Sequence, residues 1–115
     1  MTAGAFPPKV RRAVMIRSWF ACERDGRTDG LQVHHRRPRQ AGGTSDPLAA
    51  SVSNALVLCH VCHAWVESHR DAAMARGWLV PAGADPATVP ALVYEVAGPA
   101  LLTAQGSYTP VRRAA

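Results

Sequence analysis

Histidine and glutamate residues in two short segments have the types and spacings that a metal-dependent hydrolytic site uses. His34 and His35 are adjacent at the end of LQVHH, and His63 and Glu67 lie four apart in CHAWVESH. Residues four apart share one face of a helix, so His63 and Glu67 would offer a nitrogen and an oxygen ligand together. Side chains alternate across a strand, so His34 and His35 would point in different directions. One of these two histidines could then bind a metal ion while the other acts as a base.

Three arginines, Arg36, Arg37 and Arg39, follow these histidines in HHRRPR. Hydrolysis of a phosphodiester needs a base that takes a proton from water and a cation that stabilises the developing charge. A nearby cation also lowers the pKa of histidine and favours its neutral, proton-accepting form. Because the arginine fork suits phosphate, the three arginines would contact phosphate groups at such a site, without reading the base sequence.

A second candidate metal site contains cysteine. Cys59 and Cys62 form a Cys-x-x-Cys pair, and the segment Cys22-Glu23-Arg24-Asp25 repeats that spacing with aspartate in the last position. In a reducing compartment such a pair more often binds metal than forms a structural disulfide. Aspartate can also ligate zinc. The four residues that could hold a structural zinc ion are Cys22, Asp25, Cys59 and Cys62.

The pattern of apolar residues predicts the elements that would position these side chains. We expect a helix over 9–20, a strand at 31–35, a long polar loop, a strand at 55–58 and a helix over 62–76 that Gly77 ends. The short β-rich runs of 81–115 predict a β appendage. The predicted fold class is α+β, with a core of 1–80 that includes the N-terminal basic helix.

Several aromatic and histidine residues have a simpler structural interpretation. Trp19 and Phe20 would extend the apolar face of the first helix, whose opposite face would show Lys9, Arg12 and Arg17. We expect Trp65 and Trp78 in the core as well. His60 and His69 are expected to be surface residues without a catalytic role.

The charge balance favours a polyanionic partner. The chain of 115 residues has thirteen basic and eight acidic residues, and eleven of the basic residues lie in 1–76. Almost all of these cations are arginine, whose planar fork suits phosphate. The sequence shows neither a secretory signal nor an apolar run that could cross a membrane, so we expect an intracellular protein without a membrane partner.

The order of these residues resembles the HNH endonucleases, whose ββα-metal motif consists of two strands, a connecting loop and a helix around one divalent cation. VHHRRP, Asn54 and His63 match the His-His, Asn and His landmarks of that motif, and Cys59-x-x-Cys62 precedes the last histidine as in many HNH proteins. The resemblance covers roughly 20–77 and extends best to the small HNH proteins of actinobacteria and their bacteriophages.

The resemblance implies a role for each matching residue. His34, His63 and Glu67 would hold the catalytic cation, which could be Mg²⁺, Mn²⁺, Ni²⁺ or Zn²⁺. His35 would be the general base, and Asn54 would orient it through hydrogen bonds in the loop. Many relatives have aspartate where this chain has His34, although the His-His form also occurs in colicin-type DNases.

Two functions of different classes follow. The first is a metal-dependent DNA endonuclease in the cytoplasm of a bacterial host cell, acting in phage DNA packaging or processing with packaging proteins such as terminase. The second is a non-catalytic, zinc-ribbon-like module that binds nucleic acid, in which the cysteines matter and the histidines are incidental.

Overall fold

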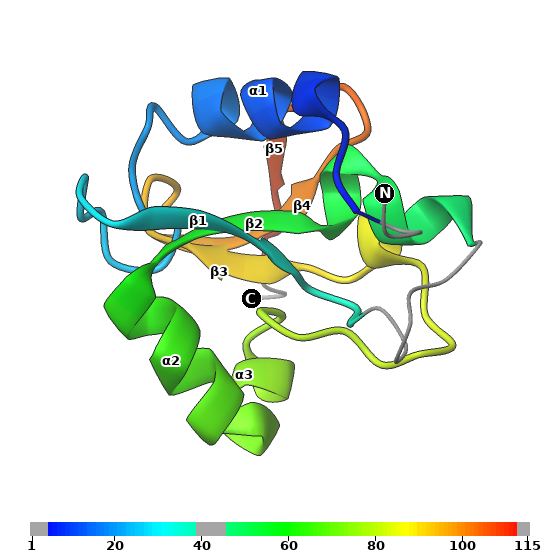
Figure 1. Cartoon of the computed structure of the whole chain (residues 1–115). Helices are drawn as coiled ribbons and strands as arrows, with labels where there is room; N and C mark the ends of the chain where they lie inside the picture. Colours follow the sequence, from blue (N-terminus) through cyan, green and yellow to red (C-terminus); the bar gives the residue numbers. More distant parts are fainter. Residues whose placement is uncertain (1–4, 39–45, 113–115) are drawn as a thin grey trace.

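A two-stranded antiparallel ribbon lies at the centre of the fold, with one helix against each of its faces (Figure 1). The computed structural model describes residues 5–38 and 46–112. The ribbon and its helices are α1 (Pro8–Arg17), β1 (Leu31–His35), β2 (Ala55–Cys59) and α2 (His60–Ser68). The order of strand, loop, strand and helix agrees with the sequence prediction, and the fold class is α+β as expected.

The register of the ribbon decides which side chains face which helix. Leu31 lies opposite Cys59 and His35 lies opposite Ala55. Val57 packs with Val14 of α1 on one face, whereas Leu56 and Leu58 belong to a second apolar cluster on the α2 face, which includes Val66. Because side chains alternate along each strand, adjacent residues of the ribbon contact different layers of the protein.

The first helix is shorter than predicted, and this reverses the expected positions of three residues. α1 ends at Arg17, and Trp19 and Phe20 have left-handed φ angles of 57° and 56°. Their side chains are 79% and 57% exposed, so the expectation that they extend the apolar face was wrong. Arg17 was expected on the polar face, yet it is only 6% exposed. The left-handed region costs bulky residues about 1–2 kcal/mol each, so such positions are normally occupied by glycine or asparagine. Trp19 and Phe20 therefore gave no sign in the sequence that the helix ends there.

The predicted helix over 62–76 is two helices, α2 and α3 (Arg70–Ala75), separated by His69 at φ −130° and ψ 58°. The Ser68 hydroxyl bonds to the Ala64 and Trp65 carbonyl oxygens, a contact that competes with regular helix. Gly77 follows α3 at φ 75°, and a Cβ there would lie 1.8 Å from the Pro90 carbonyl oxygen, so only glycine fits. Within the described residues, no helix is long and apolar enough to cross a membrane.

The C-terminal segment forms a three-stranded antiparallel sheet in the order β3-β4-β5, which agrees with its predicted β character. Ala100 and Leu102 of β4 belong to the same apolar cluster as Leu56 and Leu58 of β2. The sheet therefore packs on the interior of the ribbon and α2. Its strands and the short 3-10 helices are β3 (Ala91–Val93), β4 (Gly98–Leu102), β5 (Tyr108–Pro110), η1 (Pro47–Ala50), η2 (Val52–Asn54) and η3 (Pro86–Thr88).

A buried ion pair joins α1 to the rest of the protein. The Arg17 guanidinium donates to both carboxylate oxygens of Glu23, at 2.9 Å and 2.6 Å. The same carboxylate accepts from the Val57 backbone N–H at 2.8 Å and from the Tyr108 hydroxyl. Both charged side chains are almost completely buried, so each depends on the other for compensation of its charge.

Removing the charge of Glu23 should therefore destabilise the protein strongly. We expect Glu23→Gln to lower the free energy of unfolding by about 3–5 kcal/mol, because the substitution leaves the Arg17 cation buried without a counter-charge. Urea denaturation followed by circular dichroism measures the change. The exposed Glu95 provides the control, since Glu95→Gln should leave the midpoint almost unchanged. Equal midpoints for the two variants would contradict this account.

Candidate metal centres

The structure brings His34, His63 and Glu67 together at one end of the ribbon. Each offers one ligand atom, and these atoms all lie within 4.8 Å of one another. His34 comes from the end of β1, whereas His63 and Glu67 lie one turn apart on α2. The α2 helix and the strand therefore present two nitrogens and one oxygen to a common point, a donor set that suits several divalent cations.

Hydrogen bonds to each imidazole fix which of its nitrogens could bind an ion. His34 Nε2 lies 3.0 Å from the Trp78 carbonyl oxygen, and His63 Nδ1 lies 2.5 Å from Gln32 Oε1. Since a carbonyl oxygen only accepts, the nitrogen facing it must carry the proton, which leaves His34 Nδ1 and His63 Nε2 with lone pairs. Metal-binding histidines in proteins are usually oriented in this way.

The electrostatic surroundings favour neutral His34. Burial lowers the pKa of His34 to about 4, although its bond to Trp78 opposes the shift, and the nearby His63, His35 and Arg36 lower it further. The side chain is therefore a neutral donor at pH 7. Glu67 differs from His34 because its side chain is exposed. One of its carboxylate oxygens accepts from Arg70 Nη1 at 2.9 Å.

His35 projects from the opposite face of the ribbon. Its ring stacks on Phe6, with 3.9 Å between centroids and 17° between planes. Asn54 is fully buried; its Oδ1 accepts from the Arg37 backbone N–H at 2.7 Å, and its Nδ2 donates to the carbonyl oxygens of Arg37 and Ala49. These bonds hold the backbone two residues beyond His35, so Asn54 fixes the segment that follows the histidine pair.

The expected role of Arg36 as a phosphate contact was wrong. Arg36 is 0% exposed, and burial lowers the pKa of its guanidinium to about 10. Its N–H groups donate to the carbonyl oxygens of Gly77, Ser53, Pro86 and Val89, at 2.8, 2.9, 3.0 and 2.6 Å. Arg36 thus ties the end of β1 to segments that are distant in sequence, and its side chain has no route to a phosphate.

Arg37 is also engaged within the protein, which overturns its expected role too. It is 7% exposed and donates to Asp46 at 2.6 Å and to the Ala84 carbonyl oxygen at 3.1 Å. The third predicted phosphate contact, Arg39, lies outside the described residues. The cations that follow the histidine pair are therefore structural at the two positions that can be described.

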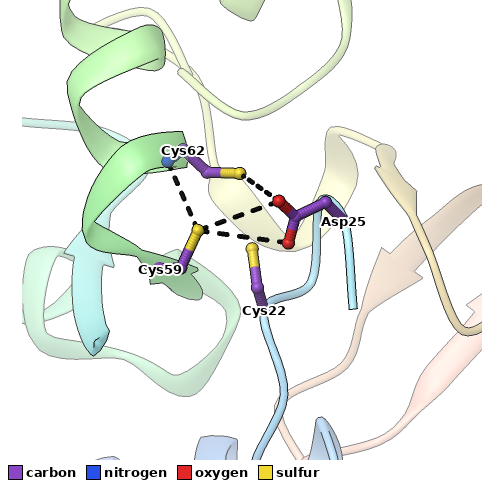
Figure 2. Close-up of side chains that lie close together, drawn as sticks. All are labelled: Cys22, Asp25, Cys59 and Cys62. Carbon is purple, nitrogen blue, oxygen red and sulfur yellow. Dashed lines mark hydrogen bonds between the residues drawn. The ribbon is translucent and has the colours of Figure 1, made fainter. Parts of the chain in front are cut away.

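The four predicted zinc ligands also come together, as Figure 2 shows. One ligand atom from each residue lies within 4.8 Å of the others. The Asp25 carboxylate points toward the thiols, and its Oδ2 lies 3.1 Å from Cys62 Sγ and 3.8 Å from Cys59 Sγ. The three cysteines are buried and free, whereas Asp25 is exposed. This cluster joins the loop after α1 to the junction of β2 and α2.

Protonation of the cluster is linked to metal binding. Burial raises the pKa of the Cys22 and Cys62 thiols. Burial alone would raise the pKa of Asp25 too, but bonds from the Arg27 N–H and from the Cys62 and Cys22 thiols lower it overall. The Cys22 and Cys62 thiols are thus protonated without an ion, and a divalent cation would bind by displacing their protons.

Two polar residues that support these groups were not identified from sequence. Arg24 Nη1 donates to Cys62 Sγ at 3.2 Å, and its guanidinium lies 4.3 Å from the centroid of the Trp65 ring. Gln32 orients His63 and lies two residues before His34, on the same face of β1. Strand alternation could have indicated Gln32, whereas only the position of Arg24 inside Cys-x-x-Asp hinted at its role.

No family model matches this chain, and neither a curated protein nor a solved structure matches it.

The cysteine cluster should bind a thiolate-coordinated metal ion. We expect the wild-type protein to bind Co²⁺ with a thiolate-to-cobalt charge-transfer absorption, because three of the four cluster ligands are sulfur. Cys59→Ser should remove most of this absorption, and Asp25→Ala should weaken Co²⁺ binding while keeping the sulfur signal. Titration by ultraviolet absorption measures both effects.

Two variants separate this cluster from its surroundings. Asp29→Ala, in the same loop but outside the cluster, should leave the absorption unchanged. His63→Ala should also leave it unchanged, since His63 belongs to the other group. A wild-type protein without any charge-transfer band would contradict metal binding by the cysteines.

Proposed function

We propose that this protein is a metal-dependent DNA endonuclease of the HNH type. The observation that supports the proposal most directly is the grouping of His34, His63 and Glu67 from a strand end and a helix. His35 follows the ligand His34 on the other face of the ribbon, and Asn54 holds the backbone beyond it. This arrangement would provide the separate cation site and the separate base that the proposed reaction requires.

In the proposed reaction, His34, His63 and Glu67 would hold a divalent cation, which would supply positive charge to stabilise the phosphate and the leaving oxygen. His35 acts as the general base and takes a proton from the attacking water. Its stacking on Phe6 keeps the plane of the imidazole fixed, so that less ordering is needed when DNA binds. A positioned base typically contributes about 10²–10⁴ in rate.

The cellular context of the proposal rests on the resemblance alone. We propose action on DNA in the cytoplasm of a bacterial host, in phage DNA packaging or processing, with packaging proteins such as terminase as partners. The cysteine cluster would have a structural part in this enzyme, since it ties the loop of Cys22 to the start of the α2 helix that carries His63.

A second function, a zinc-ribbon-like nucleic-acid-binding module, is favoured by the cysteine cluster itself. Four ligand atoms from two chain segments lie within 4.8 Å of one another, as a structural zinc site requires. Such a module would need Cys22, Asp25, Cys59 and Cys62 but would have no use for a neutral imidazole beside a second cation.

Cleavage of supercoiled plasmid separates the two functions. We expect wild-type protein to nick or cut plasmid with at least one of Mg²⁺, Mn²⁺, Ni²⁺ and Zn²⁺ and to be inactive in EDTA. His35→Ala should lower the rate by about 10²–10⁴ because the base is lost, while DNA affinity is preserved. His69→Ala is a matched control, since His69 is exposed and belongs to neither group of candidate metal ligands.

Each outcome has a distinct meaning. Equal cleavage by His35→Ala and wild type would remove His35 from the mechanism. DNA binding without cleavage in any of the four metals, combined with loss of binding in Cys59→Ser, would favour the binding module over the nuclease.

A further inference from the structure

Exposed apolar side chains gather at the C-terminal end of α1. Trp19, Phe20 and Ile16 are 79%, 57% and 59% exposed. Two large aromatic rings that both face water, next to an exposed isoleucine, form an unusual surface for a protein of this size. Nothing in the proposed catalytic chemistry uses these side chains.

Exposed cations occupy the other end of the same helix. Lys9, Arg11 and Arg12 are exposed, and α1 contains no acidic residue. Among the ion pairs of the described residues, none involves these three side chains. By contrast, Arg17, Arg36 and Arg37 are all engaged within the protein. The first turns of α1 therefore present positive charge that remains available to an anionic partner.

The two cations lie on the helix, and the aromatic residues lie in the turn that follows its C-terminal end. Lys9, Arg12 and Ile16 follow the i, i+3, i+7 spacing of a single helical face, and Trp19 and Phe20 continue beyond the end of the helix. At about 1.5 Å per residue, Lys9 and Ile16 are about 10 Å apart along the helix axis, a length over which a nucleic-acid strand carries several phosphates. We define Lys9, Arg12, Ile16, Trp19 and Phe20 as the α1 surface.

The chemistry of the α1 surface fits a single DNA strand better than a lipid surface. A helix that lies in a membrane needs an apolar stripe along its whole length. The apolar stripe of α1, with Val14 at its centre, is buried against the ribbon, and the exposed face begins with cations. Unpaired bases offer ring faces for stacking on aromatic side chains, while their phosphates pair with cations.

We propose that the α1 surface binds single-stranded DNA, with phosphates on Lys9 and Arg12 and unpaired bases on Trp19 and Phe20. In its choice of DNA as partner, the inference rests on the proposed function. The surface lies on the same side of the ribbon as His35, because Phe6, two residues before α1, stacks on that histidine. A strand held along α1 would lie on the opposite side of the ribbon from α2 (Figure 1), and it would approach the proposed general base from the N-terminal end of α1.

Fluorescence anisotropy in EDTA tests the proposal without any cleavage. The probes are a fluorescein-labelled oligothymidine and a labelled duplex of the same length. We expect Trp19→Ala and Phe20→Ala each to weaken oligothymidine binding about tenfold and duplex binding less, because stacking on unpaired bases is lost. The double variant Lys9→Gln, Arg12→Gln should reduce the slope of log affinity against log salt by about 1.4, since two phosphate contacts disappear.

Tyr94→Ala is the matched control, because Tyr94 is an aromatic side chain 60% exposed outside α1 and should leave oligothymidine affinity unchanged. Circular dichroism should show that the variants remain folded. Wild-type affinity in both Trp19→Ala and Phe20→Ala would overturn the proposal. Binding to phosphatidylglycerol vesicles that depends on Trp19, with oligothymidine affinity unaffected, would overturn it in favour of a lipid partner.

The same variants separate this inference from the nuclease proposal. Trp19-dependent oligothymidine binding by a protein that cleaves plasmid in no metal would uphold the α1 surface and overturn the nuclease. Metal-dependent cleavage that needs His35, with oligothymidine affinity independent of Trp19 and Phe20, would do the reverse.

Discussion

The Glu23 carboxylate lies in the interior and accepts hydrogen bonds from three elements that are far apart in sequence. These bonds come from Arg17 at the end of α1, Val57 in β2 and Tyr108 in β5, and the Glu23 backbone also bonds to Val57 and Tyr94. A buried charge is tolerated only when it is paired and fully hydrogen-bonded. The native positions of these partners therefore depend on one another. Because Glu23 lies between Cys22 and Asp25, the same contacts also place half of the cysteine cluster.

The two-stranded ribbon divides the candidate chemistry between its faces. His34 faces α2 and the candidate ligands His63 and Glu67, whereas His35 faces the segment before α1. The α2 helix contributes to both candidate metal groups, because it contains Cys62 of one group and His63 and Glu67 of the other. An ion in the cysteine cluster would therefore stabilise the beginning of the helix from which two candidate ligands of the other group project.

Sequence patterns predicted the local elements better than the long-range contacts. Alternation and turn residues located β1 at the observed bounds and β2 to within one residue, and helical spacing placed His63 beside Glu67. The positions of Arg36 and Trp19 could not be predicted in this way. Arg36 is buried because carbonyl oxygens from η3 and from Gly77, just after α3, converge on it. Trp19 is exposed because α1 ends at Arg17, and neither glycine nor asparagine marks that end in the sequence.

Strand register has an unusual meaning in a chain with two adjacent histidines. A slip of one residue moves every side chain of a strand to the opposite face, which would put His35 among the ligands and His34 against Phe6. An imidazole would still lie at both sites, beside α2 and beside Phe6. Gln32, however, would lose its hydrogen bond to His63, and Val33 would face α2. Hydrogen bonds from His60 N–H to the Gly30 carbonyl oxygen and from Arg36 N–H to the Asn54 carbonyl oxygen hold the two ends of the pairing at 2.9 Å and 2.8 Å. The identity of each histidine is thus a property of its strand alignment, not of the side chain itself.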